Sequence, residues 1–584
     1  MYMKNAKRYG LAFLFFVGYL GFSQETETKD IGTETVTVTK AYTPTVSDAF
    51  KIRSVPNLND SIVLQKKEIT YSIFSVPVAS TFTPSKGTAS QVEKAPAPEL
   101  FNSYASAGGG NPANVLAEFY TSHAIDRESN YTLGLNHHSS FGDIDGVELN
   151  NTFADTRLDA AYKKRDREMD WGANLGLQHQ MYHWYGLPEG FDTAGLAIDE
   201  KQHYFMGEAA AHIHVEDAYF KNANVLYRRF WDAVSSGENR AVLQGNVEFP
   251  LNEEKLGVGL KLDYVGGNFA NAGVASATND GGITYANLQG GINPRLKMLR
   301  DDLSLNLGVF IVYGMDLENN DGDFYIYPAI SASYRLMDEN LIAYGGVEGE
   351  LQQNSYFGFV EDNPFVSPTL RIEPTDRQYD AYVGIKGQLL PNVSYNLKGS
   401  YMAENFSPLF KLNPQNNFRN DAKTYYLGNS FEVFYDDIKT LGLFGEINVD
   451  INRNFTLGLN AEVYEYDTET DNPAWNRPNL MGSLFMDYQI GEQWYMGANL
   501  FYVGEREDVA TTVVPNNPPN TFPATAITLA SFFDANAHVG YRWNNQLSLF
   551  VKGANLANNN YQRWANFPVQ GLQVLAGATY KFDL

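Results

Sequence analysis

Few side chains in this sequence are spaced as a catalytic or metal site would require. His212 and His214 lie two residues apart, between Glu208 and Glu216. In an extended strand all four side chains would leave one face, because side chains alternate between faces. Imidazole and carboxylate together can bind a divalent metal. The other interpretation is an ordinary polar face of a strand, and the pattern favours this second interpretation.

Three further runs carry reactive or charged side chains. His137-His138-Ser139-Ser140 has the residue types of a hydrolase, but adjacent residues point to opposite faces, so no nucleophile–base pair is predicted. The acidic run Asp316 to Asp323 offers oxygen ligands for Ca²⁺ without the EF-hand spacing, which favours a solvated hairpin tip. The basic run Lys163 to Arg167 would contact lipopolysaccharide phosphates if it lies outside, or else mark a turn. We therefore expect no enzyme activity, no metal and no cofactor.

Composition narrows the class of protein. The chain of 584 residues has no cysteine, which excludes disulfides, thiolate chemistry and a lipoprotein anchor. Its net charge of −25 argues against a nucleic-acid partner, which would need a basic surface. The chain has 37 Tyr, 37 Phe and 50 Gly, with a mean hydropathy of −0.33. This combination suits a membrane β-barrel with a polar lumen and aromatic girdles.

Alternation with period two is the main structural signal from about Ala113 onward. Apolar rows recur, and the residues between them are mostly Gly, Asn, Thr, Lys, Asp and Glu. Two such rows are Leu256, Val258, Leu260, Leu262, Tyr264, and Leu457, Leu459, Ala461, Val463. Each strand and its connection should take roughly 20 residues, so we predict an all-β, transmembrane antiparallel barrel of about 22 strands over residues 112–584.

The last run of the chain carries a family resemblance. Leu572, Val574, Ala576, Ala578, Tyr580 and Phe582 share one face, and Gly577-x-x-Tyr580-x-Phe582 resembles the terminal signal that directs bacterial barrels to the barrel assembly machinery. Asn555-Leu556, Tyr561 and Pro568-Val569-Gln570-Gly571 are similar to the last two strands of TonB-dependent outer-membrane receptors. Two departures stand out: the chain continues to Asp583-Leu584, and Leu575 occupies a position where a polar residue is usual.

The first residues are typical of an export signal. Lys4, Lys7 and Arg8 precede an apolar stretch from Leu11 to Phe22, and cleavage is expected at Ser23-Gln24. A membrane-anchoring helix is the alternative, but the stretch is short for a full span. We predict a signal peptide over residues 1–23 and localisation in the outer membrane of a Gram-negative bacterium.

Residues 24–111 are predicted to form an extended arm. Glu34, Thr35, Val36, Thr37, Val38 and Thr39, followed by Lys40, resemble the TonB box, which implies TonB as a partner through β-augmentation. The alternative is that Thr/Val alternation is common in β-proteins. Recurrent prolines argue against a regular sheet here, and the segment is too short for the plug domain of the receptors. Ala41 to Ile52 resembles the arm of plug-less receptor-like barrels of Bacteroidota.

Two functions follow from this resemblance. The first is a TonB-dependent-receptor-like barrel that binds a ligand or transports it across the outer membrane. The second is a non-transporting barrel subunit of an outer-membrane assembly or secretion complex. A wide open barrel would leak, so the arm, inward loops or another protein must block the lumen. Expected partners are outer-membrane lipid and lipopolysaccharide, TonB, the barrel assembly machinery and other outer-membrane or periplasmic proteins contacted by the arm.

Overall fold

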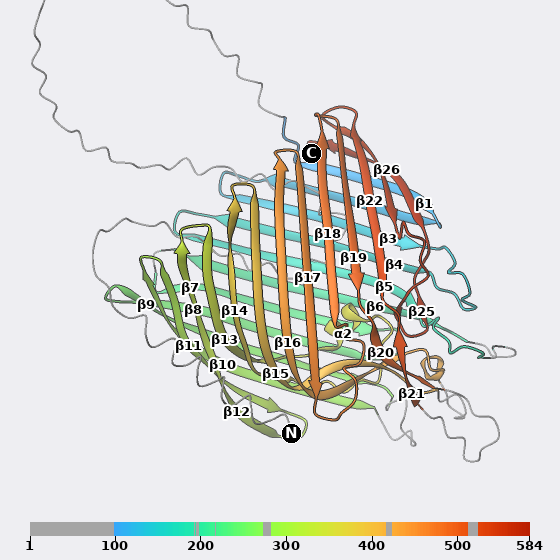
Figure 1. Cartoon of the computed structure of the whole chain (residues 1–584), viewed down its shortest axis with the longest axis horizontal. Helices are drawn as coiled ribbons and strands as arrows, with labels where there is room; N and C mark the ends of the chain where they lie inside the picture. The colour runs from blue at the N-terminus through green and yellow to red at the C-terminus, as the bar shows by residue number, and fades with distance from the viewer. Residues whose placement is uncertain are drawn as a thin grey trace, which may run out of the picture. The chain divides into compact units, whose positions relative to one another are not determined.

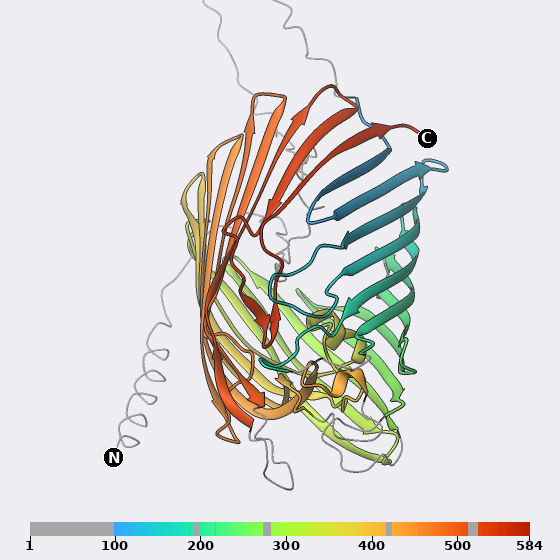
Figure 2. The same cartoon turned by 90° about the vertical axis from the view of Figure 1, so that its right-hand side faces the viewer.

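Residues 103–582 contain the strands of one closed barrel. The computed structural model describes residues 99–584 except 192, 194–197, 217, 272–281, 416–422 and 512–523. The segments 1–23 and 34–40, and most of the predicted arm, lie outside the described residues. Twenty-two antiparallel strands form a single sheet, and pairing of the first strand with the last closes it (Figures 1 and 2). The predicted fold class and strand number are therefore confirmed.

The barrel strands follow one another around the wall in chain order. They are β1 (Ser103–Asn111), β2 (Asn114–Ala124), β3 (Ser129–Ser140), β4 (Phe153–Arg165), β5 (Met169–His183), β6 (Lys201–Val215), β7 (Phe220–Asp232), β8 (Gly237–Leu251), β9 (Glu254–Phe269), β10 (Ile283–Arg300), β11 (Leu303–Asp316), β12 (Asp321–Met337), β13 (Leu341–Gln352), β14 (Thr375–Leu390), β15 (Val393–Leu412), β16 (Phe431–Asn452), β17 (Phe455–Thr468), β18 (Leu480–Ile490), β19 (Trp494–Val503), β22 (Phe532–Arg542), β23 (Leu547–Ala554) and β26 (Gln573–Phe582).

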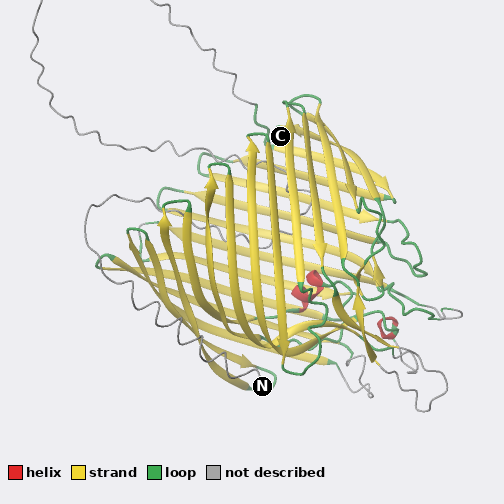
Figure 3. Cartoon of the chain, in the orientation of Figure 1, coloured by secondary structure: helices red, strands yellow, loops and turns green. Residues whose placement is uncertain are grey.

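The connections between barrel strands contain the remaining elements. These are α2 (Tyr356–Asp362), the 3₁₀ turn η3 (Thr424–Tyr426), the paired strands β20 (Arg506–Thr511) and β21 (Ala524–Leu529), and the paired strands β24 (Gln562–Trp564) and β25 (Phe567–Pro568). Figure 3 shows how little helix accompanies the strands. Within the described residues, no helix is both long enough and apolar enough to span a membrane.

The outer surface is apolar, as the alternation predicted. Leu260 and Leu262 are 53% and 50% exposed, although both are large hydrophobic side chains. Leu459 is 50% exposed on this face, whereas its neighbour Asn460 faces the lumen and accepts a hydrogen bond from Ser483. An apolar outer face with a polar inner face is what a lipid environment requires of a barrel.

The two ends of the barrel differ in their connections. At one end, which we call the turn end, neighbouring strands are joined by two to four residues, as at 391–392, 453–454 and 491–493. The carboxyl end of β26 lies here. At the opposite end, the loop end, connections reach 22 residues at 353–374 and 28 residues at 504–531.

The structure corrects the predicted boundary between arm and barrel. The barrel begins at Ser103 rather than at 112, because Gly108 to Gly110 belong to β1 and pair with β26. These glycines resembled a linker, but they permit close packing at the closing seam. A Cβ on Gly108 would lie 2.7 Å from Leu575 Cδ2, and one on Gly110 would lie 1.9 Å from the Val574 carbonyl oxygen. Leu575 is apolar because it covers this seam.

Candidate functional site

The sequence-predicted residues of the terminal signal lie together on β26. Gly577 faces the lumen, while Tyr580 and Phe582 face outward with ring centroids 5.9 Å apart. A Cβ on Gly577 would lie 2.4 Å from the carbonyl oxygen of Ala107 in β1, so glycine is also required by the seam. Recognition of these residues during assembly remains a prediction. The TonB-box-like residues Glu34–Thr39 lie outside the described residues.

The charged clusters predicted as candidate sites have structural roles in the barrel. Glu208 forms an ion pair with Arg228 on the lumen face, and His212 lies 3.9 Å from Asp170. Across the described ranges, no group of three or more metal-ligating side chains comes together. Asp316 closes the β11–β12 hairpin by accepting hydrogen bonds from the backbone N–H groups of Glu318 and Asn319. The basic run 163–167 leads into the turn between β4 and β5, at the turn end.

The interpretation of the His137 run needs one correction. His137 Nε2 lies 3.1 Å from Ser139 Oγ, because residues two positions apart in a strand share a face. Ser139 is fully buried, and His137 Nδ1 lies 2.8 Å from the hydroxyl of Thr156. The pair therefore serves as a link within the wall, with its serine shielded from any substrate.

The main feature of the lumen is a set of connections that fold inward at the loop end. Figure 2 shows α2 and neighbouring loop segments within the barrel outline, toward the end opposite the carboxyl terminus. We call this assembly the cap and define it by residues 353–374, 504–511, 524–531 and 555–572, with the loop residues 184–187 packed beside it. The cap and the lumen face of the wall share one hydrophobic cluster. Its buried members include Tyr204, Met206, Phe230, Val265, Phe269, Tyr356, Val366, Leu370, Phe431, Trp564 and Phe567.

Aromatic stacking holds different loops together at the centre of the cap. Phe365 and Phe567 have ring centroids 4.0 Å apart, and Tyr185 packs edge-on against both. The Tyr185 hydroxyl donates a hydrogen bond of 2.9 Å to the Pro568 carbonyl oxygen. Phe567 and Phe431 are 1% and 0% exposed. These contacts join three loops that are far apart in sequence into a core that is buried and closely packed, like a protein interior.

The short helix α2 is attached to the wall through its first turn. The hydroxyl of Ser355 accepts a hydrogen bond from the Gly358 N–H and caps the helix. Glu238, at the start of β8, accepts hydrogen bonds from the backbone N–H groups of Tyr356 and Phe357. Its carboxylate also accepts one of 2.7 Å from the hydroxyl of Tyr285 in β10. Free N–H groups at a helix start need such acceptors, and a carboxylate is the strongest available.

The β20–β21 hairpin is attached by buried charges. Asp508 is fully buried and accepts hydrogen bonds from the Leu412 N–H at 3.0 Å and from Asn476 Nδ2 at 2.7 Å. Burial raises the pKa of the Asp508 carboxyl to about 6. Arg506 donates to the carbonyl oxygens of Gln562 and Arg563, which ties this hairpin to the β24–β25 connection. Burial, together with the charge of Arg563, lowers the pKa of Arg506 to about 10.

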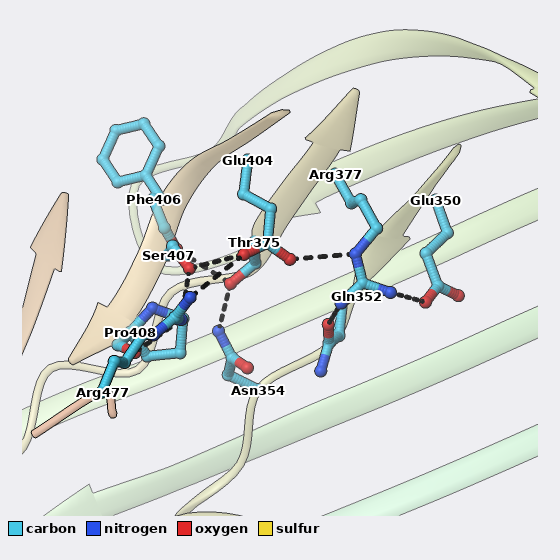
Figure 4. A network of polar contacts seen from close by, with 10 residues as sticks. All are labelled: Glu350, Gln352, Asn354, Thr375, Arg377, Glu404, Phe406, Ser407, Pro408 and Arg477. Atoms are coloured by element: carbon cyan, nitrogen blue, oxygen red, sulfur yellow. Dashed lines mark hydrogen bonds and ion pairs between the residues drawn. The ribbon is translucent and has the colours of Figure 1, made fainter. Parts of the chain in front are cut away.

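Beside the cap, a polar network links the neighbouring wall strands β13, β14 and β15 (Figure 4). Arg377 of β14 donates to Glu404 of β15 at 2.9 Å, to Glu350 of β13 at 3.3 Å and to Gln352 at 3.0 Å. Arg477, in the connection after β17, donates to Ser407 at 2.8 Å. Glu404 is 5% exposed and also accepts from the Ser407 hydroxyl. A buried carboxylate with two arginines nearby fixes the spacing of β13 to β15 where the cap meets the wall.

Sequence reasoning did not find the cap residues. Inward loops were one of three ways considered to block the lumen, but no residue was assigned to them. A signal was present, because the lumen-facing positions of several strands become aromatic or aliphatic toward one end, as at Tyr204 and Met206 in β6. The cap can restrict passage through the lumen, and its opening would require loops to leave a buried core.

Comparison with known proteins shows what the barrel resembles. No protein-family model matches the chain, and no curated protein matches it. Among solved structures, the FrpB iron transporter from Neisseria meningitidis (F5-1 variant) is 10% identical, with a TM-score of 0.63 over 83% of each chain. The ferripyoverdine receptor of the outer membrane of Pseudomonas aeruginosa is 14% identical, with a TM-score of 0.60 over 84% of this chain and 72% of that one.

A third solved structure agrees with these two. The siderophore receptor PirA from Acinetobacter baumannii is 13% identical, with a TM-score of 0.59 over 82% of this chain and 80% of that one. At such identities the likeness establishes the fold. Together with the apolar outer face, it shows that this chain is a 22-stranded β-barrel of the outer-membrane type.

Proposed function

We propose that this protein is an outer-membrane receptor-like barrel that binds a ligand and passes it through a lumen gated by the cap. The observation that carries the proposal is the loop-built core inside a barrel of receptor fold. In this proposal the carboxyl end of β26 faces the periplasm, as its terminal signal implies, so the cap faces the outside. The basic turn at 163–167 then faces the periplasm, away from the lipopolysaccharide leaflet.

An engineered crosslink tests the gate. Val366 of the cap forms a β-bridge with Phe431 of β16, and the chain has no native cysteine that could interfere. The variant Val366→Cys/Phe431→Cys places two thiols at a separation that a disulfide can span. Uptake of the ligand should stop on oxidation and return on reduction, so the reduced form serves as an internal control. The matched pair Asn460→Cys/Ser483→Cys joins neighbouring wall strands and should leave uptake unchanged.

Energy for opening is proposed to come from TonB through Glu34–Thr39. Proline at Val36 or Val38 removes a main-chain donor from the strand that would pair with TonB. Either substitution should abolish uptake while the amount of barrel in the membrane stays normal. Unchanged uptake would exclude this coupling and favour the second function below.

A non-transporting subunit of an outer-membrane complex is the second candidate. The depth of the cap core favours it, since Val366 and Phe431 are both fully buried and a closed barrel suits a scaffold. The arm would then bind a partner through apolar residues such as Tyr42, Phe50 and Phe74. Full-length protein and a variant lacking residues 25–98 should be purified from membranes and compared. Loss of a co-purifying protein supports the scaffold, and a rise in ion conductance supports an arm that closes the lumen.

A further inference from the structure

The lumen wall contains a recess of about 430 Å³ across β8 to β13, with Arg377 and Asp380 of β14 at its edge. Small residues form its floor: Ala329 of β12 lines the recess, and Gly308 of β11 lies beside Ala329 in the pairing register. Phe310 provides an apolar side, and Gln244, Asn246 and Asn293 provide amides. The recess therefore exists because the side chains in the middle of the wall are small.

Opposite charges flank this floor. The pairing registers place Arg295 of β10 beside Gly308, and Ala329 beside Glu348 of β13. Glu348 in turn pairs with Asp380. Arg295 and Glu348 thus lie three strand spacings apart, about 14 Å between their backbones. Lys261 lies on the side of Arg295 and forms an ion pair of 3.7 Å with Asp263.

The side chain of Arg295 lies across the floor. A Cβ on Gly308 would be only 2.6 Å from Arg295 Cγ, so the glycine is what allows the arginine to occupy this position. Arg295 Nε donates to Asn293 Oδ1 at 2.9 Å, which holds the guanidinium over the recess. Its remaining donors can bind a planar anion such as a carboxylate.

Arg295 and Glu348, both among the described residues, do not form an ion pair with each other. Elsewhere on the same wall, Arg240 pairs with Asp263 at 2.8 Å and Arg377 pairs with Glu404 at 2.9 Å. Within the described parts of the chain, neither Arg295 nor Glu348 forms an ion pair. Asp380 Oδ1 is buried without a hydrogen-bond partner in the same part of the chain. Asp380 pairs with Glu348 across β13 and β14, so it adds a second carboxylate on that side of the recess.

We propose that the recess binds a short peptide with free termini, its carboxylate at Arg295 and its ammonium group at Glu348 and Asp380. A tetrapeptide spans at most about 13 Å when extended, which is close to the separation of about 14 Å between the backbones of the two charged sides. The amide of Asn293 would pair with its backbone beside Arg295, and Phe310 would contact an apolar side chain. A simple anion would satisfy only the Arg295 side and face repulsion at the other.

The inference rests on the proposed function only for entry, because a ligand from outside would have to pass the cap. Binding itself can be measured on purified full-length protein in detergent micelles, where both ends of the barrel are accessible. Tetraalanine is the probe, together with its N-acetylated and C-amidated forms, and Ala-Leu-Phe-Ala serves as a second peptide with larger apolar side chains. Isothermal titration calorimetry gives each affinity.

The free peptides should bind, and blocking either end should weaken binding about tenfold or more, since each blocked end loses a hydrogen bond between charged groups. Arg295→Gln should remove the difference between free and amidated peptide while keeping the penalty for acetylation. Glu348→Gln should remove the difference between free and N-acetylated peptide while keeping the penalty for amidation. Lys552→Gln and Glu118→Gln alter lumen charges on β23 and β2, outside the recess, and should leave every affinity unchanged.

Failure of both free peptides to bind at millimolar concentration would overturn the site. So would binding that ignores terminal blocking, or equal effects from the control variants. Terminus-dependent binding by a protein that shows no uptake would support the recess and contradict transport. Uptake of another ligand by a protein that binds neither peptide would do the opposite, so the two proposals can fail separately.

Discussion

The two ends of the lumen are built from the same strands but present different environments. In β6, Tyr204 and Met206 are 1% and 3% exposed within the cap core, while His212 and His214 further along the same face are partly exposed. All four side chains point inward by the same alternation. The difference is that loops fold over the first pair and leave the second pair to water. Inward direction alone therefore does not decide whether a lumen residue is buried.

The same contrast appears in how charges are treated. Near the cap, Glu238 and Asp508 are 1% and 0% exposed and accept hydrogen bonds from backbone N–H groups across the boundary between cap and wall, from Tyr356 and from Leu412 of β15 respectively. Toward the turn end, carboxylates such as Glu446 remain partly exposed and bond to neighbouring side chains of the same strand. A carboxylate at the loop end therefore positions a loop, whereas one at the turn end lines a wet wall.

The largest effect should come from the centre of the cap core. Phe567→Ala removes the stack with Phe365 and leaves a cavity in a dry site, which should destabilise the cap by about 3–5 kcal/mol. Hydrogen exchange of cap amides and ion conductance in planar bilayers would both report it. Phe444→Ala, also on the lumen face but only partly buried, is the matched control. Similar losses of stability in the two variants would contradict the contrast between a buried loop end and a solvated turn end.

The outer face gives the next largest effect. Leu459→Arg places a charge toward lipid and should impair membrane insertion by about 2–4 kcal/mol if the position is near the midplane. Asn460→Arg places the same charge in the wet part of the lumen and should be tolerated. The yield of heat-modifiable, folded barrel in membranes measures both. Equal yields would contradict the assignment of faces.

A pH dependence of the cap should follow from Asp508. Burial raises the pKa of this carboxyl to about 6 in the folded protein, above its ordinary value of 3.8. Between about pH 4 and 6 the folded state still binds a proton at Asp508 that the unfolded state has released. The contribution of this carboxyl to the stability of the folded state therefore falls as pH rises through that range, and it is constant above it. Two pKa units correspond to about 3 kcal/mol as an upper limit.

Asp508→Asn tests this contribution directly. The variant should flatten the pH dependence of cap opening, because its amide does not titrate between about pH 4 and 6. Hydrogen exchange, corrected for intrinsic exchange rates, provides the measurement. A cap whose opening has the same slope with pH in both proteins would show that this carboxyl does not govern it.

The smallest predicted effect concerns the anchor of α2. Glu238→Gln keeps the shape of the side chain but loses the negative charge at the helix start, which should cost about 1–2 kcal/mol. Faster exchange at the Tyr356 and Phe357 amides would show it. Glu446→Gln, whose carboxylate accepts from Asn448 Nδ2 on the wet wall, should leave those amides unchanged. An equal response would mean that Glu238 is no anchor.

The sequence by itself determined the wall. Period-two alternation separates a face for lipid from a face for the lumen, and this local pattern together with the chain length predicted an antiparallel barrel of about 22 strands and its exposed rows, such as that of Leu459. The same pattern misplaced the start of the barrel, because Gly108 to Gly110 resemble a linker. The small size of Gly108 and Gly110 is explained by Val574 and Leu575, which lie more than four hundred positions away in the chain and pack against them.

Only the tertiary structure decided what the lumen contains. Phe365, Phe431 and Phe567 come from three separate regions of the sequence, and no local period relates them. The recess likewise depends on Arg295, Gly308 and Glu348 lying side by side through the registers of four strands. Alternation is a property of each strand alone, whereas a core or a binding recess forms where several strands and loops meet. That is why the faces of the wall were predictable, and why the cap and the recess were not.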